Sequence, residues 1–339
     1  MHVTGDIIYI PDPYFGSTLA PNAHCHIQRE VTSEHIYTND LGWRENAAAQ
    51  KATERDIAFI GCSWPMGVGV QSKYCFAQKT AHNLKKNVAN LGVGSYSLIQ
   101  AIRRLENNID TIKPKVVILS YGHWLVNRCF KSNAMGGIII RPIYKQNQDG
   151  FLQIVNPSNP SIRDFNRYVT LHRKDRLNFF ETLEFKILGF RINLQIRHYG
   201  LQKLRGFRYI HGSSDARFFK YRQYVLKQEA KRLVELCEQH NTKLLIFHLS
   251  PYVMKNEQDC FEIKQDDAFW KSIKTEYPHV HYEPPDTMDG LIQSLVKKFG
   301  NQRNLLDEIH CPDNNHPNEK GHQLIADAII KSIKKNELM

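Results

Sequence analysis

Short apolar runs alternate with helical stretches between residues 56 and 119, and this alternation limits the folds open to the chain. The apolar runs cover 57–60, 88–91 and 116–119, and glycines follow the first two. The stretches between them, 74–84 and 96–112, carry apolar side chains at helical spacing. Strands joined through helices pair in parallel, because a helical crossover returns the chain to the same end of the sheet. This segment therefore predicts a parallel sheet covered by helices.

The same rhythm resumes in the second half of the chain. Helical patterns cover 221–240, 268–277 and 321–335, and short strands are expected at 243–249 and 280–282. We therefore predict an α/β fold, a three-layer α/β/α sandwich around a mainly parallel five-stranded sheet.

Two segments do not follow this rhythm. Residues 1–55 are rich in turn signals, and we predict an N-terminal extension with little regular structure that packs on the core. The main domain would span 56–339, interrupted at about 130–215 by a basic insertion that is partly helical, at 177–188.

Composition indicates a globular protein. Hydrophobic residues make up 42% of the 339 residues and charged residues 23%. No apolar run approaches the roughly 18 residues that cross a bilayer, and the N-terminus lacks a secretory signal. As written, the chain is expected to be cytoplasmic, with membrane association or export left open. Seven cysteines without a C-x-x-C pair predict reduced, mostly buried thiols, and no metal or cofactor is expected.

Positive charge is concentrated in the insertion. The formal net charge is +11, and residues 163–227 hold fifteen Lys and Arg against five Asp and Glu. Such a segment contacts an anionic polymer or a membrane surface, or it is simply a solvated face. Aromatic residues lie between these cations, yet nothing matches a nucleic-acid-binding module, so nucleic acid is not expected as a partner. We favour a cap over the active site.

Polar residues follow two of the predicted strands and precede the last helix. Gly61-Cys62-Ser63 follows the first strand, and Asn90-Leu-Gly92-Val-Gly94 follows the second. Asp313-x-x-His316 precedes the last helix. Reacting groups in parallel α/β sheets gather at the carboxyl ends of the strands. A serine there needs a base, and the base needs an orienting partner.

These segments resemble blocks of the SGNH/GDSL hydrolases. The stretch 56–70 is similar to the first block, 90–94 to the second, and Asp313-x-x-His316-Pro-Asn-x-x-Gly321-His322 to the last. The segment 37–44 resembles one that precedes the core in some bacterial members. The resemblance covers about 55–125 and 240–335 and leaves the basic insertion outside.

The resemblance implies specific roles for individual residues. Ser63 would be the nucleophile, His316 the general base and Asp313 its partner. The N–H groups of Ser63 and Gly94 would form an oxyanion hole. His322 is expected to pack at the start of the last helix.

The third block departs from the family pattern of Gly-x-Asn-Asp. The chain has Ser120-Tyr-Gly-His123-Trp124-Leu-Val-Asn127-Arg128 there, so His123 and Asn127 are candidate third oxyanion donors. Trp64 and Trp124 are candidate substrate contacts. Cys62 replaces the aspartate of Gly-Asp-Ser, and its thiol is expected to point to the opposite side of the turn from Ser63.

The resemblance favours a serine esterase that forms an acyl-Ser63 intermediate. Its expected substrate is a carboxylic ester, such as an O-acetyl group, on a carbohydrate or a lipid-linked molecule. Two alternatives stay open. One is an acyltransferase that modifies a glycan through the same intermediate, and the other is a non-catalytic binding module on the same fold.

Overall fold

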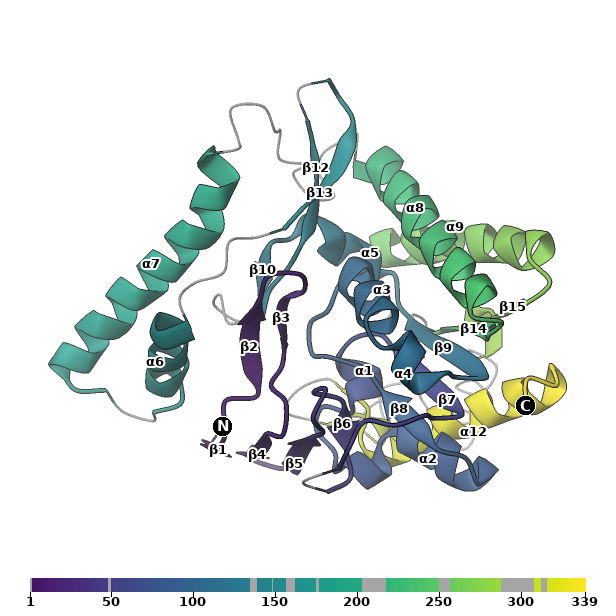
Figure 1. The fold of residues 1–339 in the computed structure, drawn as a ribbon, viewed down its shortest axis with the longest axis horizontal. Helices are drawn as coiled ribbons and strands as arrows, with labels where there is room; N and C mark the ends of the chain where they lie inside the picture. Colours follow the sequence, from purple (N-terminus) through teal and green to yellow (C-terminus); the bar gives the residue numbers. More distant parts are fainter. Residues whose placement is uncertain are drawn as a thin grey trace.

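The computed structural model describes most of the chain (Figure 1). The described residues are 2–47, 50–134, 139–147, 149–156, 162–174, 177–202, 218–249, 257–287, 308–311 and 316–339. Asp313 lies outside them.

A five-stranded parallel sheet forms the centre of the molecule, in the order β15-β14-β9-β7-β8. Its strands are β7 (Ile57–Ile60), β8 (Val88–Asn90), β9 (Val116–Tyr121), β14 (Lys243–His248) and β15 (Val280–Glu283). Every neighbouring pair is parallel. The predicted sheet is therefore confirmed, and each of the five strands lies where the sequence pattern placed it.

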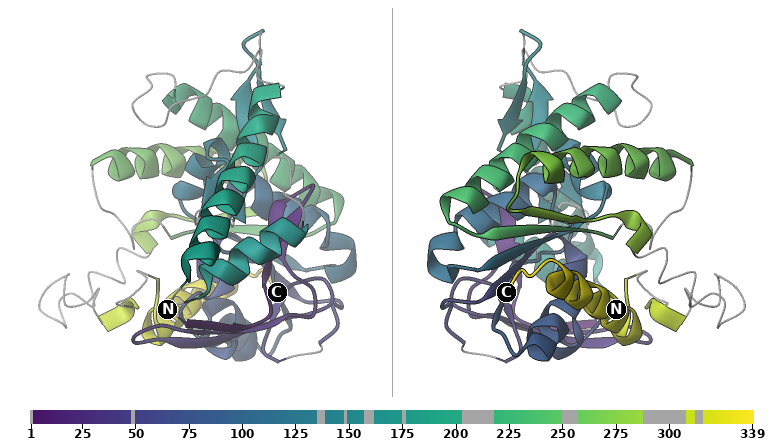
Figure 2. Two further views of the ribbon diagram at one scale, coloured as in Figure 1. Left: turned by 90° about the vertical axis from the view of Figure 1, so that its left-hand side faces the viewer. Right: turned by 90° about the vertical axis from the view of Figure 1, so that its right-hand side faces the viewer.

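Helices cover both faces of this sheet. Alternate side chains of each strand point to opposite faces, and both sets are apolar, so each face needs a covering layer. Ala58 and Ile60 of β7 enter one hydrophobic core, and Ile57 and Phe59 enter the other. The first core is closed mainly by α3 (Leu98–Glu106) and α8 (Phe218–Gln239). The second is closed by α2 (Phe76–Leu84) and α12 (Glu319–Lys335). Figure 2 shows α12 and α8 on opposite sides of the central strands, which confirms the three-layer sandwich.

The main domain also includes the helices α4 (Ile109–Ile112), α5 (Trp124–Asn127) and α9 (Glu257–Glu276). The sequence predicted one helix over 96–112, but the chain ends α3 at Glu106 and starts α4 at Ile109. The side chain of Asn108 accounts for the break, because its amide bonds back to the carbonyl of Arg104 and its carbonyl oxygen accepts from the Trp43 indole.

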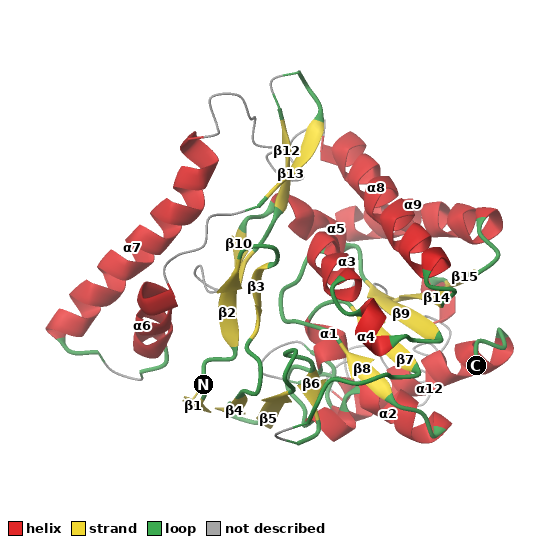
Figure 3. Cartoon of the chain, in the orientation of Figure 1, coloured by secondary structure: helices red, strands yellow, loops and turns green. Residues whose placement is uncertain are grey.

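The N-terminal segment is a β structure, so the prediction of little regular structure over 1–55 was wrong. A four-stranded antiparallel sheet has the order β1-β4-β5-β6, and β2 pairs with β3 in a hairpin (Figure 3). These strands are β1 (His2–Gly5), β2 (Tyr9–Asp12), β3 (Gly16–Leu19), β4 (His24–Gln28), β5 (Ser33–Thr38) and β6 (Arg44–Glu45). Leu19, Ile36 and Trp43 are buried in the same core as one face of the central sheet.

The insertion contains strands as well as helices. Its strands form two hairpins, β10 (Asn133–Ala134) with β11 (Ile139–Ile140) and β12 (Ile143–Gln146) with β13 (Leu152–Val155). Its helices, α6 (Ile162–His172) and α7 (Phe179–Gln202), pack on each other, and α6 also contacts β2. Figure 1 shows both helices at one side of the molecule, with the N-terminal strands between them and the central sheet.

Helix α7 is apolar on two faces. Leu188 and Ile192 are buried against α6, whereas Phe180, Ile187 and Phe190 are exposed. Along the described part of the chain, no helix combines the length and the apolar character needed to span a membrane.

Candidate active site

The turn after β7 places a serine at the carboxyl edge of the sheet. Gly61 has φ 145°, and a Cβ on it would lie 3.1 Å from the carbonyl oxygen of Ser120 and 3.0 Å from Cγ of Pro65. Only glycine fits this close approach. The turn delivers Ser63 as the first residue of α1 (Ser63–Met66), between β7 and β9. This is where the strand order of a doubly wound sheet reverses, and where ligands of such folds bind.

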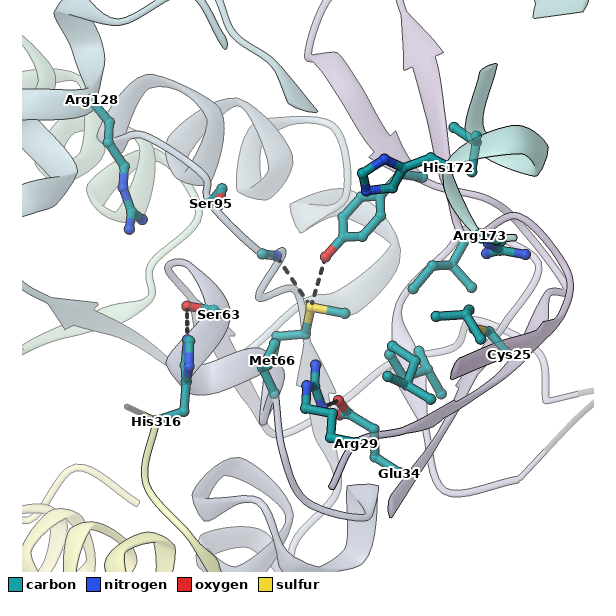
Figure 4. A pocket seen from close by; sticks show the side chains of 18 residues that line it. Cys25, Arg29, Glu34, Ser63, Met66, Ser95, Arg128, His172, Arg173 and His316 are labelled. Atoms are coloured by element: carbon teal, nitrogen blue, oxygen red, sulfur yellow. Dashed lines mark hydrogen bonds and ion pairs between the residues drawn. The ribbon is translucent and has the colours of Figure 1, made fainter. Parts of the chain in front are cut away.

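Ser63 and His316 are in direct contact. The Oγ of Ser63 lies 2.8 Å from Nε2 of His316, and the serine is only 8% exposed (Figure 4). The two residues predicted as nucleophile and base are thus hydrogen-bonded. Asp313, their predicted partner, lies outside the described residues, so its position stays a prediction.

Backbone and side-chain hydrogen bonds hold the segment that carries His316. The N–H of Cys311 donates to the carbonyl of His316 over 2.7 Å. Two residues later, the Asn318 side chain accepts from the N–H groups of Lys320 and Gly321 and so caps α12. The imidazole is therefore fixed by the start of the last helix.

His322 has a structural position, as the sequence predicted. It is fully buried, and its Nδ1 accepts a hydrogen bond of 3.1 Å from the N–H of Phe76, the first residue of α2. Burial, with a smaller contribution from Arg44, lowers the pKa of this imidazole well below its usual value. A neutral His322 therefore joins α12 to α2.

The second predicted oxyanion donor, Gly94, has its N–H directed elsewhere. That N–H donates to Sδ of Met66 over 3.2 Å, although Gly94 does line the cavity beside Ser63. The next residue, Ser95, lines the same cavity and has φ 63°. Within the described parts of the chain, no hydrogen bond uses the N–H of Ser63 or of Ser95. Ser95 was not among the residues predicted from the sequence, although it directly follows the glycine-rich turn at 92–94.

The two candidates from the third block point away from Ser63. The amide nitrogen of Asn127 donates to Glu262 over 2.7 Å, and its oxygen accepts from Arg222 over 2.8 Å. His123 is buried with Nε2 3.2 Å from Oδ1 of Asp259, and burial lowers its pKa. Neither lines the cavity at Ser63, because both face a buried ionic network centred on Arg222. Their prediction as oxyanion donors is therefore not supported by the geometry.

Arg128, one residue beyond Asn127, does reach this cavity. It lines the cavity together with Ser63 and Ser95, and its guanidinium donates to the carbonyl of Tyr96 over 3.1 Å. Figure 4 shows its side chain directed toward the side of the site that holds Ser63 and Ser95. The sequence placed Arg128 in the divergent block without identifying it as a site residue.

The thiol of Cys62 lies close to Ser63, contrary to the prediction that it would point to the opposite side of the turn. Its Sγ is 3.9 Å from Oγ of Ser63 and accepts from the Trp124 indole N–H over 3.4 Å. Burial acts to raise the pKa of this thiol, but the Arg128 guanidinium and the Trp124 indole outweigh it, so the pKa lies below its usual value. The imidazole of His316 nevertheless bonds to the hydroxyl of Ser63.

The two predicted substrate contacts do not line the cavity. Trp64 is buried in the second hydrophobic core, and its ring lies 5.6 Å from that of Trp124. Trp124 follows the third strand, and its indole N–H donates to Sγ of Cys62. It is not among the residues that line the cavity. Among the residues that the structure describes, no group of three His, Cys, Asp or Glu side chains is arranged to hold a metal ion.

Comparison with known proteins gives distant structural similarity only. No protein-family model and no curated protein sequence matches the chain. Among solved structures, it is similar to the psychrotrophic esterase EstA from Pseudoalteromonas sp., with 13% identity, 82% of this chain and 96% of that chain covered, and a TM-score of 0.41. It is also similar to TesA, with 9% identity, 83% and 98% covered, and a TM-score of 0.41.

A third similar structure is a gut microbial diltiazem-metabolizing enzyme. The identity is 15%, the similarity covers 84% of this chain and 47% of that one, and the TM-score is 0.42.

Proposed function

We propose that this chain is a serine esterase that works through an acyl-Ser63 intermediate. The observation that carries the proposal is the 2.8 Å contact between Oγ of Ser63 and Nε2 of His316 at the switch point of the sheet. A serine hydroxyl is a weak nucleophile, and an imidazole at hydrogen-bonding distance activates it by accepting its proton.

The reaction proceeds in two halves. Oγ of Ser63 attacks the ester carbonyl carbon while its proton passes to Nε2 of His316. The tetrahedral adduct collapses, the bond to the alcohol oxygen breaks, and His316 returns the proton to that oxygen. Water then attacks the acyl group, His316 accepts its proton and passes it to Oγ of Ser63, and the carboxylic acid leaves.

Three donors are proposed to stabilise the oxyanion of the tetrahedral adduct. They are the N–H groups of Ser63 and Ser95 and the guanidinium of Arg128, which all border the same cavity. Arg128 takes the place in this scheme that the sequence assigned to His123 or Asn127. A cation is a strong donor in a partly desolvated site, because its hydrogen bonds are charge-assisted.

Asp313 completes the proposal as the group that orients His316. It lies three residues before the imidazole in the sequence, and a carboxylate on Nδ1 would hold the ring in the tautomer that accepts from Ser63. The same acyl-serine also serves transfer to a glycan hydroxyl, so hydrolysis and transfer differ only in the acceptor.

The test is hydrolysis of p-nitrophenyl butyrate by the purified protein and by Ser63→Ala, His316→Ala and Cys62→Ala variants. Loss of Ser63 or His316 is expected to reduce kcat by on the order of 10⁴-fold or more, whereas loss of Cys62 leaves turnover within tenfold. Ser120→Ala is a matched control, because this buried serine is the last but one residue of the neighbouring strand and lies outside the proposed machinery.

A second readout identifies the nucleophile directly. A fluorophosphonate should label the wild-type protein at Ser63, with the site mapped by mass spectrometry. Equal turnover in wild type and Ser63→Ala, or labelling at another residue, would overturn the proposal. Including a sugar in the assay and measuring ester formation on it separates transfer from hydrolysis.

A further inference from the structure

A cavity of about 370 Å³ extends from Ser63 and His316 to the N-terminal sheet. Met66 lies between the two ends, and Figure 4 shows it between Ser63 and Cys25. Six of the residues that line the cavity have aliphatic side chains. They are Val3, Ile8, Ile27, Ile36, Val68 and Val169.

The pleat of the N-terminal sheet explains this lining. In the antiparallel register, Val3 is opposite Ile27, which is opposite Glu34, and Cys25 is opposite Ile36. Residues opposite each other share a face of a sheet, so these side chains all point toward the cavity. The other face carries the stacked rings of His24, Tyr37, His26 and His35. The sheet therefore turns its aliphatic face toward the catalytic serine.

The charged groups of the N-terminal sheet and of the end of α6 that line this cavity make hydrogen bonds within the protein. Glu34 accepts from Arg29 over 2.5 Å and from the N–H of Gly69 over 3.0 Å. Arg173 of the insertion donates to the carbonyls of Gly5 and Asp6 over 3.2 and 2.8 Å. Because Glu34 is paired with Arg29 and the donors of Arg173 are bound to two backbone carbonyls, the aliphatic side chains make this wall better suited to an aliphatic ligand than to an ionic one.

We propose that this cavity binds the aliphatic acyl chain of the substrate, so that the enzyme prefers esters of medium-chain or longer acids to acetyl esters. This inference rests on the proposed function, because it takes Ser63 as the point where the chain begins. The N-terminal sheet and α6, which lie outside the core blocks of the resemblance at about 55–125 and 240–335, would then form the specificity pocket.

The catalytic geometry assigns the cavity to the acyl part rather than to the alcohol part of the ester. His316 must protonate the leaving alcohol, so the alcohol oxygen lies beside Nε2 of the imidazole. The acyl chain leaves the carbonyl carbon in another direction. The cavity continues past Met66 and past Gly94, which directly precedes the proposed donor Ser95. This is the path open to the acyl chain.

The first experiment compares acyl-chain lengths at constant leaving group. The p-nitrophenyl esters of acetate, butyrate and octanoate should show kcat/KM rising by about fourfold for each added methylene that is buried. A reciprocal series, with acetyl esters of ethanol, butanol and octanol, keeps the acyl group constant. Chain-length dependence confined to the alcohol series would overturn the assignment to the acyl chain.

A filling variant locates the pocket. Ile27→Trp adds an indole to the cavity-facing side of β4 and should reduce kcat/KM for octanoate ester by tenfold or more while leaving acetate ester within threefold. Val31→Trp is the matched control, because Val31 lies in the turn between β4 and β5 and is 59% exposed. Equal losses on both esters in Ile27→Trp, or equal effects of the two variants, would contradict the proposal.

Direct binding separates failure of this inference from failure of the proposed function. Decanoate binding to the Ser63→Ala variant, measured by calorimetry, should be weakened at least tenfold by adding Ile27→Trp and unchanged by adding Val31→Trp. If decanoate binds and Ile27→Trp alone weakens that binding, but the protein hydrolyses no ester, the esterase proposal is contradicted and the pocket proposal is supported. If ester hydrolysis does not depend on acyl-chain length and decanoate does not bind, the pocket proposal is contradicted and the esterase proposal stands.

Discussion

The guanidinium of Arg44 donates a hydrogen bond of 2.5 Å to the backbone carbonyl of Met66, three residues after the candidate nucleophile. It also donates to the carbonyls of Gly67 and Val70, over 2.6 and 2.7 Å. Arg44 belongs to the short strand β6 and is fully buried. The N-terminal segment thus holds the loop that follows Ser63, although it lies outside the central sheet.

We expect Arg44→Ala to destabilise the protein strongly. The substitution leaves three buried carbonyls without this donor and removes a cation 3.9 Å from the buried Glu34. The free energy of unfolding should fall by about 3 kcal/mol or more, measured by urea denaturation. Arg191→Ala, at an exposed arginine, should change it by less than about 0.5 kcal/mol. Similar losses in the two variants would show that the Arg44 contacts contribute little.

The sequence predicted the central sheet well because its signal is local. Each buried strand is a short apolar run, and each is separated from the next by a helical stripe or by glycine. The N-terminal strands lack this signal, since β5 buries Glu34, Ile36 and Thr38 on one side, and a buried Glu and Thr look polar in sequence. Only the pairing with Arg29 and the loop at Gly69, both revealed by the structure, makes a buried Glu34 reasonable.

The sequence predicted part of the candidate site. Ser63 and His316 are in contact as the family resemblance implied, although 253 residues separate them. The geometry favours neighbours of the predicted oxyanion donors, because the N–H of Gly94 bonds to Met66, and because Arg128 lines the cavity whereas His123 and Asn127 do not. A one-residue difference in a loop depends on backbone dihedrals, such as the positive φ of Ser95, and residue spacing does not report them. The cavity proposed to bind the acyl chain depends on long-range packing of three segments and left no sequence motif.

Gly61→Ala should disturb the turn that presents Ser63. A Cβ there meets the backbone of the neighbouring strand, and the residue has φ 145°. Backbone strain of this kind costs about 1–3 kcal/mol, and the steric contact adds to it. Gly150→Ala is the matched control, because Gly150 also has a positive φ but its nearest neighbour is a flexible glutamine side chain at 3.5 Å. Thermal denaturation should show the larger loss for Gly61→Ala, and equal losses would mean that the turn adapts.

Acid should weaken the contact made by His322. Its pKa in the folded protein is well below the value of about 6.5 that it has in an unfolded chain, so the unfolded state binds the proton more readily. The stability from the neutral imidazole is therefore present above pH 6.5 and is lost as pH falls below it. The loss from this one group should reach about 1.4 kcal/mol at pH 5.5.

Urea denaturation at pH 7.5 and 5.5 measures this effect. His322→Gln removes the titrating group, so the difference in unfolding free energy between the two pH values should shrink by about 1 kcal/mol. His82→Gln, at an exposed histidine of α2, should leave the difference unchanged. An unchanged difference in His322→Gln would show that the imidazole is already protonated, or accessible to protons, in the folded state.

Arg128→Ala should reduce turnover with little change in substrate binding. If the guanidinium stabilises the oxyanion, it acts mainly in the transition state, and loss of one such donor lowers kcat by about 100- to 1,000-fold. Arg128→Lys keeps the charge and should recover part of the activity. Lys131→Ala removes an exposed cation three residues away and should leave kcat within twofold. A raised KM with kcat retained in Arg128→Ala would instead assign the guanidinium to binding of the ground-state ester, because uniform binding affects KM alone.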